Sequence, residues 1–275
     1  MTRPPRFPVP LDRLHGKAPG HSRKSATEVL RPQRPLQHAA EHAAKQAAGQ
    51  GTPSGLGMDS AAVRERMVQR LRADGIRHEG VLQAFATVER HRFVDSALAT
   101  QAYEDTSLPI GLSQTISKPS VVARMLALLF EGENARSNGH LGRVMEIGTG
   151  CGYQAALLAL LARSVVSIER LQALHDKART HLGERRQGDL RLVYGDGRLG
   201  HAPRAPYDSI VAAAGGEDLP TAWLDQLAVG GRLVAPMFDA ARGGQGLVVV
   251  DRTAAGYVRH WQDAVHFVPL KSGAA

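Results

Sequence analysis

From residue 142 onward, the sequence alternates between short apolar segments rich in β-branched residues and stretches with helical character. This alternation is typical of a doubly wound α/β sheet whose strands are mostly parallel. The last stretch, 257–270, predicts one or two further strands, which we expect to be antiparallel. We therefore predict a Rossmann-like sheet over 142–271, with strands at 143–147, 165–168, 190–194, 209–213, 232–236 and 247–250 and helices at 153–162 and 171–182.

A glycine-rich turn, E-I-G-T-G-C-G over 146–152, joins the first of these strands to the helix that follows it. Glycines let a backbone turn tightly and approach a ligand closely. Such a turn is compatible with NAD, FAD or S-adenosylmethionine. It is also compatible with a purely structural role, in which the glycines only allow the strand and the helix to pack closely.

Three acidic residues near the ends of successive strands favour S-adenosylmethionine. Glu146 lies in the first strand, where it could meet a cationic amino-acid group, and Glu169 ends the second, where it could accept both ribose hydroxyls. Asp196 follows the third strand, where it could bind the amino group of adenine. The turn also lacks the G-x-G-x-x-G spacing of a pyrophosphate binder.

A helical portion precedes the sheet. We expect a helix from 59 to 73 with Asp59 as its cap, a second helix near 79–88 and an apolar helix over 120–130. A loop rich in Ser, Gly, Gln and Thr separates the last two helices. The sequence thus predicts an N-terminal helical subdomain, and a single domain over 58–275 that consists of a helical and lid portion, 58–130, and the cofactor-binding sheet, 142–271.

The charge of the chain is concentrated at its N-terminus. The formal net charge is +8, and residues 1–57 hold nine Lys and Arg against three Asp and Glu, so the remainder is nearly balanced. Proline, glycine and charged residues punctuate this segment, and large apolar residues are few, which predicts a disordered basic extension over 1–57. Its composition also resembles an organellar transit peptide, and an arm that binds anionic polymers is a further alternative.

The chain has one cysteine, Cys151. An internal disulfide is therefore excluded, no Cys pair exists to seed a structural zinc site, and we expect no metal. A nucleophilic role for Cys151 is disfavoured because no His or acid lies near it in sequence. The longest apolar run, 155–162, is too short to cross a bilayer, and we expect a cytoplasmic protein without membrane contact.

Many short segments are collinear with those of a known family. The run P-I-G followed by Q-T-I-S over 109–117 is the most specific of them, whereas the G-T-G turn is shared by many methyltransferases. The segments lie at 92–95, 102–105, 108–111, 113–119, 144–150, 152–154, 167–170, 195–197, 205–208, 226–227, 230–234 and 267–270. On these segments, which span roughly 60–271, the chain resembles the protein-L-isoaspartate O-methyltransferase family. It departs from the family pattern at Leu112-Ser113, where a polar residue followed by glycine is more frequent, at Cys151, where Ser is common, and at 214–216.

This resemblance implies a seven-stranded methyltransferase fold and an enzyme that transfers a methyl group from S-adenosyl-L-methionine to the α-carboxylate of L-isoaspartyl residues. The methyl ester collapses to a succinimide, which initiates repair of the damaged protein. The resemblance places the active-site serine at Ser117. We expect cofactor contacts from Thr115, Ile116, Glu146, Gly148, Thr149, Gly150, Gly152, Glu169, Arg170, Asp196, Gly197 and Gln245. The expected partners are isoaspartyl proteins and peptides, with no specific nucleic acid, and we expect a monomer.

The chemistry requires little acid–base assistance. An isoaspartyl α-carboxylate has a pKa of roughly 3.5, so it is already ionised at neutral pH. The enzyme must mainly align the carboxylate with the methyl group and exclude water. Our hypothesis is that Ser117 donates a hydrogen bond to this carboxylate, although it could instead cap the helix that begins near Pro119. We expect the flexible loop 105–117 and a late strand, 265–268, to form a lid that binds the peptide.

Two other functions compete with this interpretation. The same cofactor fold could serve an RNA or small-molecule methyltransferase, but the nearly balanced charge after residue 57 argues against an RNA substrate. A nucleic-acid-binding protein acting through its basic arm is the alternative from another class.

Overall fold

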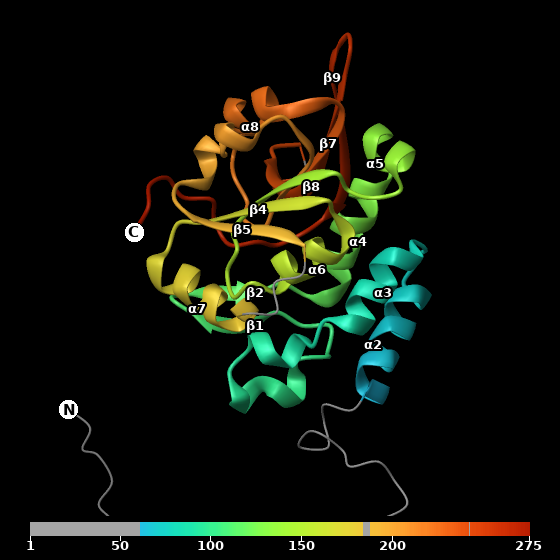
Figure 1. The fold of residues 1–275 in the computed structure, drawn as a ribbon, viewed down its shortest axis with the longest axis vertical. Helices are drawn as coiled ribbons and strands as arrows, with labels where there is room; N and C mark the ends of the chain where they lie inside the picture. Colours follow the sequence, from blue (N-terminus) through green and yellow to red (C-terminus); the bar gives the residue numbers. More distant parts are fainter. Residues whose placement is uncertain (1–60, 184–187, 242) are drawn as a thin grey trace, which may run out of the picture. The chain divides into compact units, whose positions relative to one another are not determined.

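A seven-stranded sheet forms the centre of the protein, in the order β5-β4-β3-β6-β7-β8-β9 (Figure 1). The computed structural model describes residues 61–183, 188–241 and 243–275, so the predicted extension over 1–57 and the predicted cap at Asp59 lie outside the described residues. The strands are β3 (Arg143–Ile147), β4 (Ser164–Glu169), β5 (Asp189–Tyr194), β6 (Tyr207–Ala212), β7 (Leu227–Asp239), β8 (Gly244–Thr253) and β9 (Gly256–Ala264).

Parallel pairing dominates this sheet. Strands β5, β4, β3, β6 and β7 pair in parallel, and β8 pairs antiparallel with both β7 and β9. The doubly wound, mostly parallel sheet expected from the sequence is therefore confirmed, as is the antiparallel stretch that follows 257.

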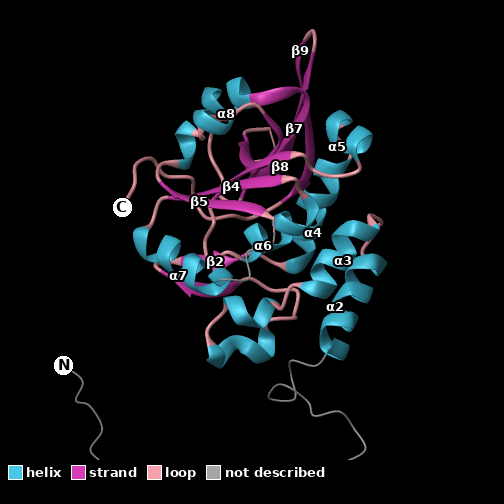
Figure 2. Cartoon of the chain, viewed as in Figure 1, coloured by secondary structure: helices cyan, strands magenta, loops and turns pink. Residues whose placement is uncertain are grey.

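Helices cover both faces of the sheet, as the cyan and magenta elements of Figure 2 show. The α-helices are α2 (Ala61–Ala73), α3 (Glu79–Thr87), α4 (Pro119–Phe130), α5 (Glu133–Asn138), α6 (Tyr153–Leu161), α7 (Gln172–Leu182) and α8 (Thr221–Gln226). Short 3-10 helices are η1 (Arg90–Phe93), η2 (Ser96–Gln101), η4 (Gly197–Leu199) and η5 (Ala202–Arg204). Helices α2, α3 and α4 correspond to the N-terminal helical portion that the sequence predicts.

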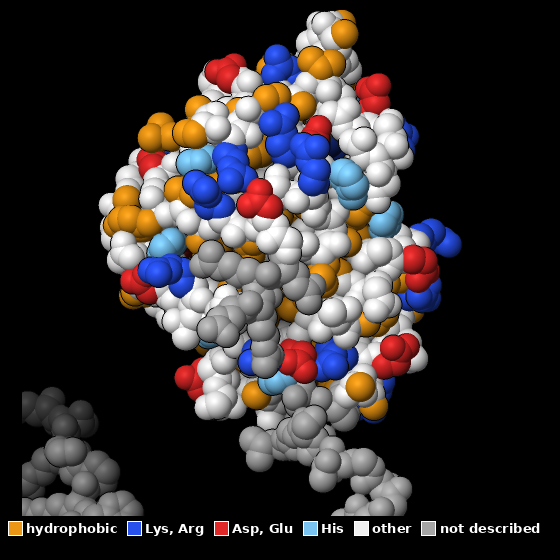
Figure 3. All heavy atoms as spheres, in the orientation of Figure 1, with side chains coloured by type: hydrophobic (Ala, Val, Ile, Leu, Met, Phe, Trp, Pro, Cys, Tyr) orange, Lys and Arg blue, Asp and Glu red, His pale blue; other side chains and the backbone are white. Residues whose placement is uncertain are grey.

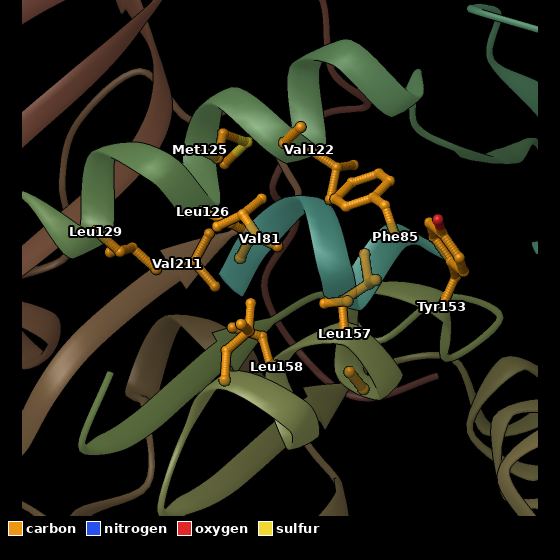
Figure 4. Packing of buried hydrophobic residues seen from close by; sticks show 14 of the residues in the cluster. Val81, Phe85, Val122, Met125, Leu126, Leu129, Tyr153, Leu157, Leu158 and Val211 are labelled. Carbon is orange, nitrogen blue, oxygen red and sulfur yellow. The ribbon is translucent and has the colours of Figure 1, made fainter. Parts of the chain in front are cut away.

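Alternate residues of each central strand face opposite sides of the sheet, and both sides are apolar, as expected for buried parallel strands. On one side, Val144 and Val211 join the larger core with α3, α4 and α6. Figure 4 shows Val211 of β6 among side chains from these three helices, including Val81 and Leu158. On the other side, Met145 and its neighbours pack against Trp223 of α8, which is fully buried.

The order of the strands determines where a ligand site forms. From β3 the chain passes through α6 to β4 and through α7 to β5, and it then returns to the other side of β3 to form β6. The connections after β3 and β6 therefore diverge to opposite faces. A crevice outside the carboxyl ends of the strands is expected at such a switch point.

Two expectations about the lid are corrected by the structure. The lid loop predicted over 105–117 contains a hairpin of β1 (Leu108–Gly111) and β2 (Gln114–Ile116), in which Leu108 pairs with Ile116. The late strand predicted at 265–268 is not formed, because β9 ends at Ala264. The side chain of Gln245 accepts a hydrogen bond from Phe267 N at 2.7 Å and donates to Phe267 O at 3.3 Å, so these backbone groups do not enter the ladder.

Candidate active site

A cavity of about 430 Å³ opens at the carboxyl ends of β3 and β4. Its walls come from the β1–β2 hairpin, the glycine-rich turn after β3, the start of α7 and the C-terminal residues 268–271. The residues that were predicted from the sequence and that line this cavity are Thr115, Ile116, Ser117, Gly148, Thr149, Gly150, Glu169, Arg170 and Gly197. Four other predicted residues, Glu146, Gly152, Asp196 and Gln245, are not part of the lining.

The glycine-rich turn and Glu169 hold each other at the rim of this cavity. Gly148, Gly150 and Gly152 have φ values of 90°, 55° and 94°, in the left-handed region that favours glycine. The N–H of Gly150 donates to Oε2 of Glu169 at 2.9 Å, and the N–H of Leu171 donates to Oε1 at 2.9 Å. Because a carboxylate oxygen accepts more than one hydrogen bond, both oxygens retain capacity for the hydroxyls of a ligand.

A buried polar chain supports the turn from behind. Ser167 Oγ donates to Oε2 of Glu146 at 2.5 Å, and the hydroxyls of Thr149 and Ser167 are 2.6 Å apart. If Ser167 gives its single proton to Glu146, Thr149 is the donor to Ser167, and a protonated Glu146 allows the reverse order. Burial raises the pKa of Glu146 to about 8, and the hydrogen bond from Ser167 opposes this rise. Glu146 thus stabilises the turn without lining the cavity, and its contact with a cationic group stays a prediction.

Two buried polar atoms near this chain, Oε1 of Glu146 and Nε2 of Gln154, have no partner at full hydrogen-bond geometry, although a weaker interaction between the two side chains lowers the pKa of Glu146. Gln154 lines the cavity, and sequence reasoning did not single it out as a site residue. A ligand that has an amino-acid end to meet a donor and an acceptor, and hydroxyls to meet Glu169, matches this set of groups. The residues present therefore fit S-adenosyl-L-methionine.

Residues 268–271 form one wall of the cavity, and the residues that follow them are held by hydrogen bonds. Asp196, expected to bind adenine, accepts a hydrogen bond from Arg198 N at 2.9 Å and from Gly273 N at 2.7 Å, and it lies outside the lining. The N–H of Ala275 donates to the carbonyl of Arg170, and Arg170 Nε donates to the carbonyl of Gly273, both within 2.9 Å. Sequence reasoning missed these contacts of the last residues, because neither their types nor their spacing indicates partners that lie about 80 to 100 residues earlier in the chain.

Ser117 lies where two cavities meet. Of the residues that the structure describes, Ser117 alone lines both the main cavity and a second one of about 320 Å³. The second cavity is lined by Ser107, Ser117, Lys118, Val121, Ala264, Val265, His266 and Phe267.

The helix-capping alternative for Ser117 is wrong. The N-cap of α4 is Lys118, which makes no side-chain cap bond. Asp105 instead accepts from the N–H of Ser120 at 2.9 Å and from its hydroxyl at 2.8 Å. The start of α4 is thus satisfied from another loop, and the hydroxyl of Ser117 is not required there.

Other reactive chemistry finds no support at this site. Cys151 is buried, and burial raises the pKa of its thiol to about 11, so it is not a thiolate at neutral pH. Within residues 61–183, 188–241 and 243–275 no cluster of three His, Cys, Asp or Glu side chains could hold a metal ion. Over the same ranges, no helix has the length and apolar composition needed to cross a bilayer.

Comparison with known proteins agrees with this geometry. A family model described as protein-L-isoaspartate(D-aspartate) O-methyltransferase matches residues 62–275. The chain is 62% identical over 271 residues to a protein-L-isoaspartate O-methyltransferase of Methylibium petroleiphilum, covering 98% of this chain and 96% of the relative. It is 57% identical to the enzyme of the same name from Leptothrix cholodnii, covering 100% of this chain and 97% of the relative.

Solved structures give the same result for the fold. A structure of a protein-L-isoaspartate O-methyltransferase matches with a TM-score of 0.67 at 25% identity, covering 76% of this chain and 66% of that one. A candidate enzyme of this kind from Plasmodium falciparum, in complex with S-adenosyl-L-homocysteine, matches with a TM-score of 0.62 at 21% identity, covering 76% and 98%.

Proposed function

The chain belongs to the protein-L-isoaspartate(D-aspartate) O-methyltransferase family, whose members use S-adenosyl-L-methionine to methylate isoaspartyl residues in protein repair, and we propose that Ser117 orients the acceptor carboxylate in this reaction. The observation that carries the proposal is the place of Ser117 at the junction of two cavities. The main cavity receives the cofactor, and the second receives the peptide around the isoaspartyl residue.

In this proposal the main cavity binds the cofactor through groups that the fold has already oriented. Glu169 accepts the ribose hydroxyls, and Gln154, which lines the cavity, binds the carboxylate of the amino-acid end. The turn at Gly148, Thr149 and Gly150 and the residues Thr115, Ile116, Arg170 and Gly197 enclose the rest. When bound, the cofactor supplies an electrophilic methyl group on a positively charged sulfur.

No general base is needed at Ser117. The acceptor carboxylate, with a pKa of roughly 3.5, is ionised at neutral pH, so the protein holds it in line with the methyl group and excludes water. The hydroxyl of Ser117 donates one hydrogen bond to this carboxylate. The cavity walls from the hairpin and from residues 268–271 keep water away from the reacting atoms.

The second cavity offers main-chain groups to an extended peptide. After β9 ends at Ala264, residues 265–267 form part of its wall and lie outside the sheet. Val265 N and both main-chain groups of Phe267 are bonded to Gln245, so an extended peptide would pair by strand addition through the main chain of His266. The lid of this site therefore consists of the β1–β2 hairpin and the segment 265–268, which is not a strand.

A Ser117→Ala variant tests the proposal. Loss of one hydrogen bond to a charged group costs about 1.5–3 kcal/mol, so kcat/KM for an isoaspartyl peptide should fall roughly 10- to 100-fold. Transfer of labelled methyl from S-adenosyl-L-methionine measures this, with the aspartyl form of the same peptide as the negative control. Ser137→Ala is the matched control, because Ser137 is exposed on α5 and lines neither cavity. Full kcat/KM in Ser117→Ala, with unchanged stability, would exclude the proposed role.

The remaining expectations concern organisation and partners, and we retain them as parts of this proposal. They are a monomer in the cytoplasm, with one catalytic domain over 58–275 and a basic extension over 1–57 that takes no part in methyl transfer. On the face shown in Figure 3, several Lys and Arg side chains gather in the upper half, with few acidic ones among them. The nearly balanced charge of the residues after 57 supports a protein substrate over a nucleic acid. Deletion of 1–57 should leave methyl transfer intact, and light scattering on the full chain measures the oligomeric state.

A further inference from the structure

Arg90 carries a positive charge into the interior of the protein. It begins η1, and its side chain is completely buried. Its Nε donates to the carbonyl of Ala102 at 2.8 Å, and its Nη2 donates to the carbonyl of Ser117 at 2.7 Å. The guanidinium carbon also lies 4.8 Å from the centre of the Tyr153 ring. One side chain thus connects η1, the end of η2, the segment after β2 and α6.

In the part of the chain that the structure describes, no carboxylate forms a salt bridge with this charge. Burial lowers the pKa of Arg90, and the side chains of Tyr153, Cys151 and, last, Asp105 oppose this, yet arginine stays protonated in proteins. The two oxygens of Asp105 accept hydrogen bonds from Ser120 rather than from Arg90. The charge is thus held by main-chain carbonyls and by the Tyr153 side chain, without a carboxylate partner among the described residues. A buried cation without a counter-charge is costly to desolvate.

The carbonyl that Arg90 binds belongs to the residue at the junction of the two cavities. Ser117 lies between the end of β2 at Ile116 and the cap of α4 at Lys118. Asp105 holds the start of α4, and Arg90 holds Ser117 from the interior side. Arg90 lines neither cavity, so it can act on a substrate only through Ser117 or through its charge.

We propose that Arg90 is a positioning residue for methyl transfer: it fixes the main chain of Ser117 so that the hydroxyl meets the acceptor carboxylate. The inference rests on the proposed role of Ser117. It assigns a function to a buried charge that is held by main-chain carbonyls and an aromatic ring and has no carboxylate partner in the described part of the chain.

Two substitutions separate the effect of the two guanidinium hydrogen bonds from the effect of the positive charge. Arg90→Met removes the planar guanidinium and its charge while keeping an unbranched apolar stem, and Arg90→Lys keeps the charge without the guanidinium. We expect kcat/KM for an isoaspartyl peptide to fall on the order of 100-fold in Arg90→Met, the scale of a small misplacement of a reacting group. Arg90→Lys should show a smaller loss. Affinity for S-adenosyl-L-homocysteine, measured by calorimetry, should be unchanged in both, because Arg90 does not line the main cavity.

A double-mutant cycle tests whether Arg90 acts through Ser117. If it does, the substitution at Arg90 should have little further effect in a Ser117→Ala background, so that the two losses are not additive. Arg64→Gln is the matched control. Arg64 Nε also donates to a carbonyl, that of Ala86, over a distance of 3.0 Å, but Arg64 lines neither cavity. This control should lower stability without lowering kcat/KM of the folded enzyme.

The outcomes distinguish this inference from the role of Ser117. A loss in Ser117→Ala with full kcat/KM in both Arg90 variants overturns the inference alone. If Ser117→Ala keeps full kcat/KM, the proposed role of Ser117 is overturned, and so is the inference that Arg90 acts through Ser117. If the losses in kcat/KM from the Arg90 and Ser117 substitutions add, the inference is overturned. It is also overturned if an Arg90 variant loses affinity for S-adenosyl-L-homocysteine by the same factor as kcat/KM, because Arg90 then only maintains the fold. If Arg90→Met does not fold, Arg90→Lys alone decides, with a loss in kcat/KM at unchanged cofactor affinity expected.

Discussion

The N–H of Gly150 donates to Oε2 of Glu169 across 2.9 Å, which links the turn after β3 to the acidic end of β4. Gly150 follows β3 and Glu169 ends β4. These strands are parallel neighbours, so their carboxyl ends lie at one edge of the sheet. The carboxylate is thereby oriented before a ligand arrives. This preorganisation leads to the first of four predictions.

Replacement of Glu169 by Gln should weaken cofactor binding. The amide has one acceptor oxygen, so it cannot accept from both Gly150 N and Leu171 N and also bind two hydroxyls. Each lost hydrogen bond to a charged group is worth about 1.5–3 kcal/mol, so we expect the Kd for S-adenosyl-L-homocysteine to rise roughly 10- to 100-fold. Calorimetry measures the affinity, with exposed Asp176→Asn on α7 as control. An unchanged Kd would contradict the assigned role of Glu169.

The buried carboxyl of Glu146 should make stability depend on pH. Its pKa is raised to about 8 in the folded protein, whereas an unfolded Glu titrates near about 4.3. Between these values the folded state holds a proton that the unfolded state has released, so stability falls as pH rises from about 4.3 to about 8. The total loss amounts to a few kcal/mol in order of magnitude. Glu146→Gln removes this titration.

Urea denaturation of both proteins at several pH values measures the effect. The free energy of unfolding of the wild type should fall relative to that of Glu146→Gln as pH increases over this window. Parallel pH profiles for the two proteins would show that Glu146 is ionised in the folded state.

The tip of the β1–β2 hairpin should accept a stabilising substitution. Leu112 and Ser113 have φ values of 52° and 57°, which side chains other than Gly, Asn and Asp rarely adopt. A two-residue hairpin turn with positive φ at both positions favours Asn followed by Gly. Leu112→Asn combined with Ser113→Gly should raise the free energy of unfolding by about 1–2 kcal/mol.

The midpoint of urea denaturation is the measurement for this pair. Ser113→Ala is the control, since it changes the side chain without relieving the backbone. A lower midpoint in the double variant would mean that packing of the exposed Leu112 outweighs the relief of backbone strain.

Removal of residues 272–275 should weaken cofactor binding more than it weakens the fold. These residues are exposed, but they carry the hydrogen bonds from Gly273 N to Asp196 and from Ala275 N to Arg170 that hold the cavity wall in place. We expect a faster dissociation of S-adenosyl-L-homocysteine with little change in the urea midpoint. Stopped-flow displacement measures the rate, and Lys271→Ala, which leaves these backbone bonds intact, is the control. An unchanged rate would mean that the wall stays closed without its tail.

The sequence predicted those features that depend on local patterns. Strands β3 to β8 follow from β-branched apolar runs, and the turn at 148–152 follows from its glycines. The hairpin at 108–116 was expected to be a loop because Leu112-Ser113 lacks the Asn-Gly signature of a two-residue turn. The strand expected at 265–268 is absent because Gln245, 22 residues from Phe267, takes up its backbone groups with a side chain.

By itself, the sequence determined the class of fold, the family and most of the cofactor cavity, because strand periodicity, glycine conformation and acidic strand ends are properties of neighbouring residues. Only the tertiary structure decided that Asp196 binds the tail 77 residues away, that Asp105 rather than Ser117 holds the start of α4, and that Arg90 reaches the carbonyl of Ser117. The physical reason is that a hydrogen bond depends on distance and angle in space. Residue type reveals which groups need a partner, and folding selects which partner they obtain.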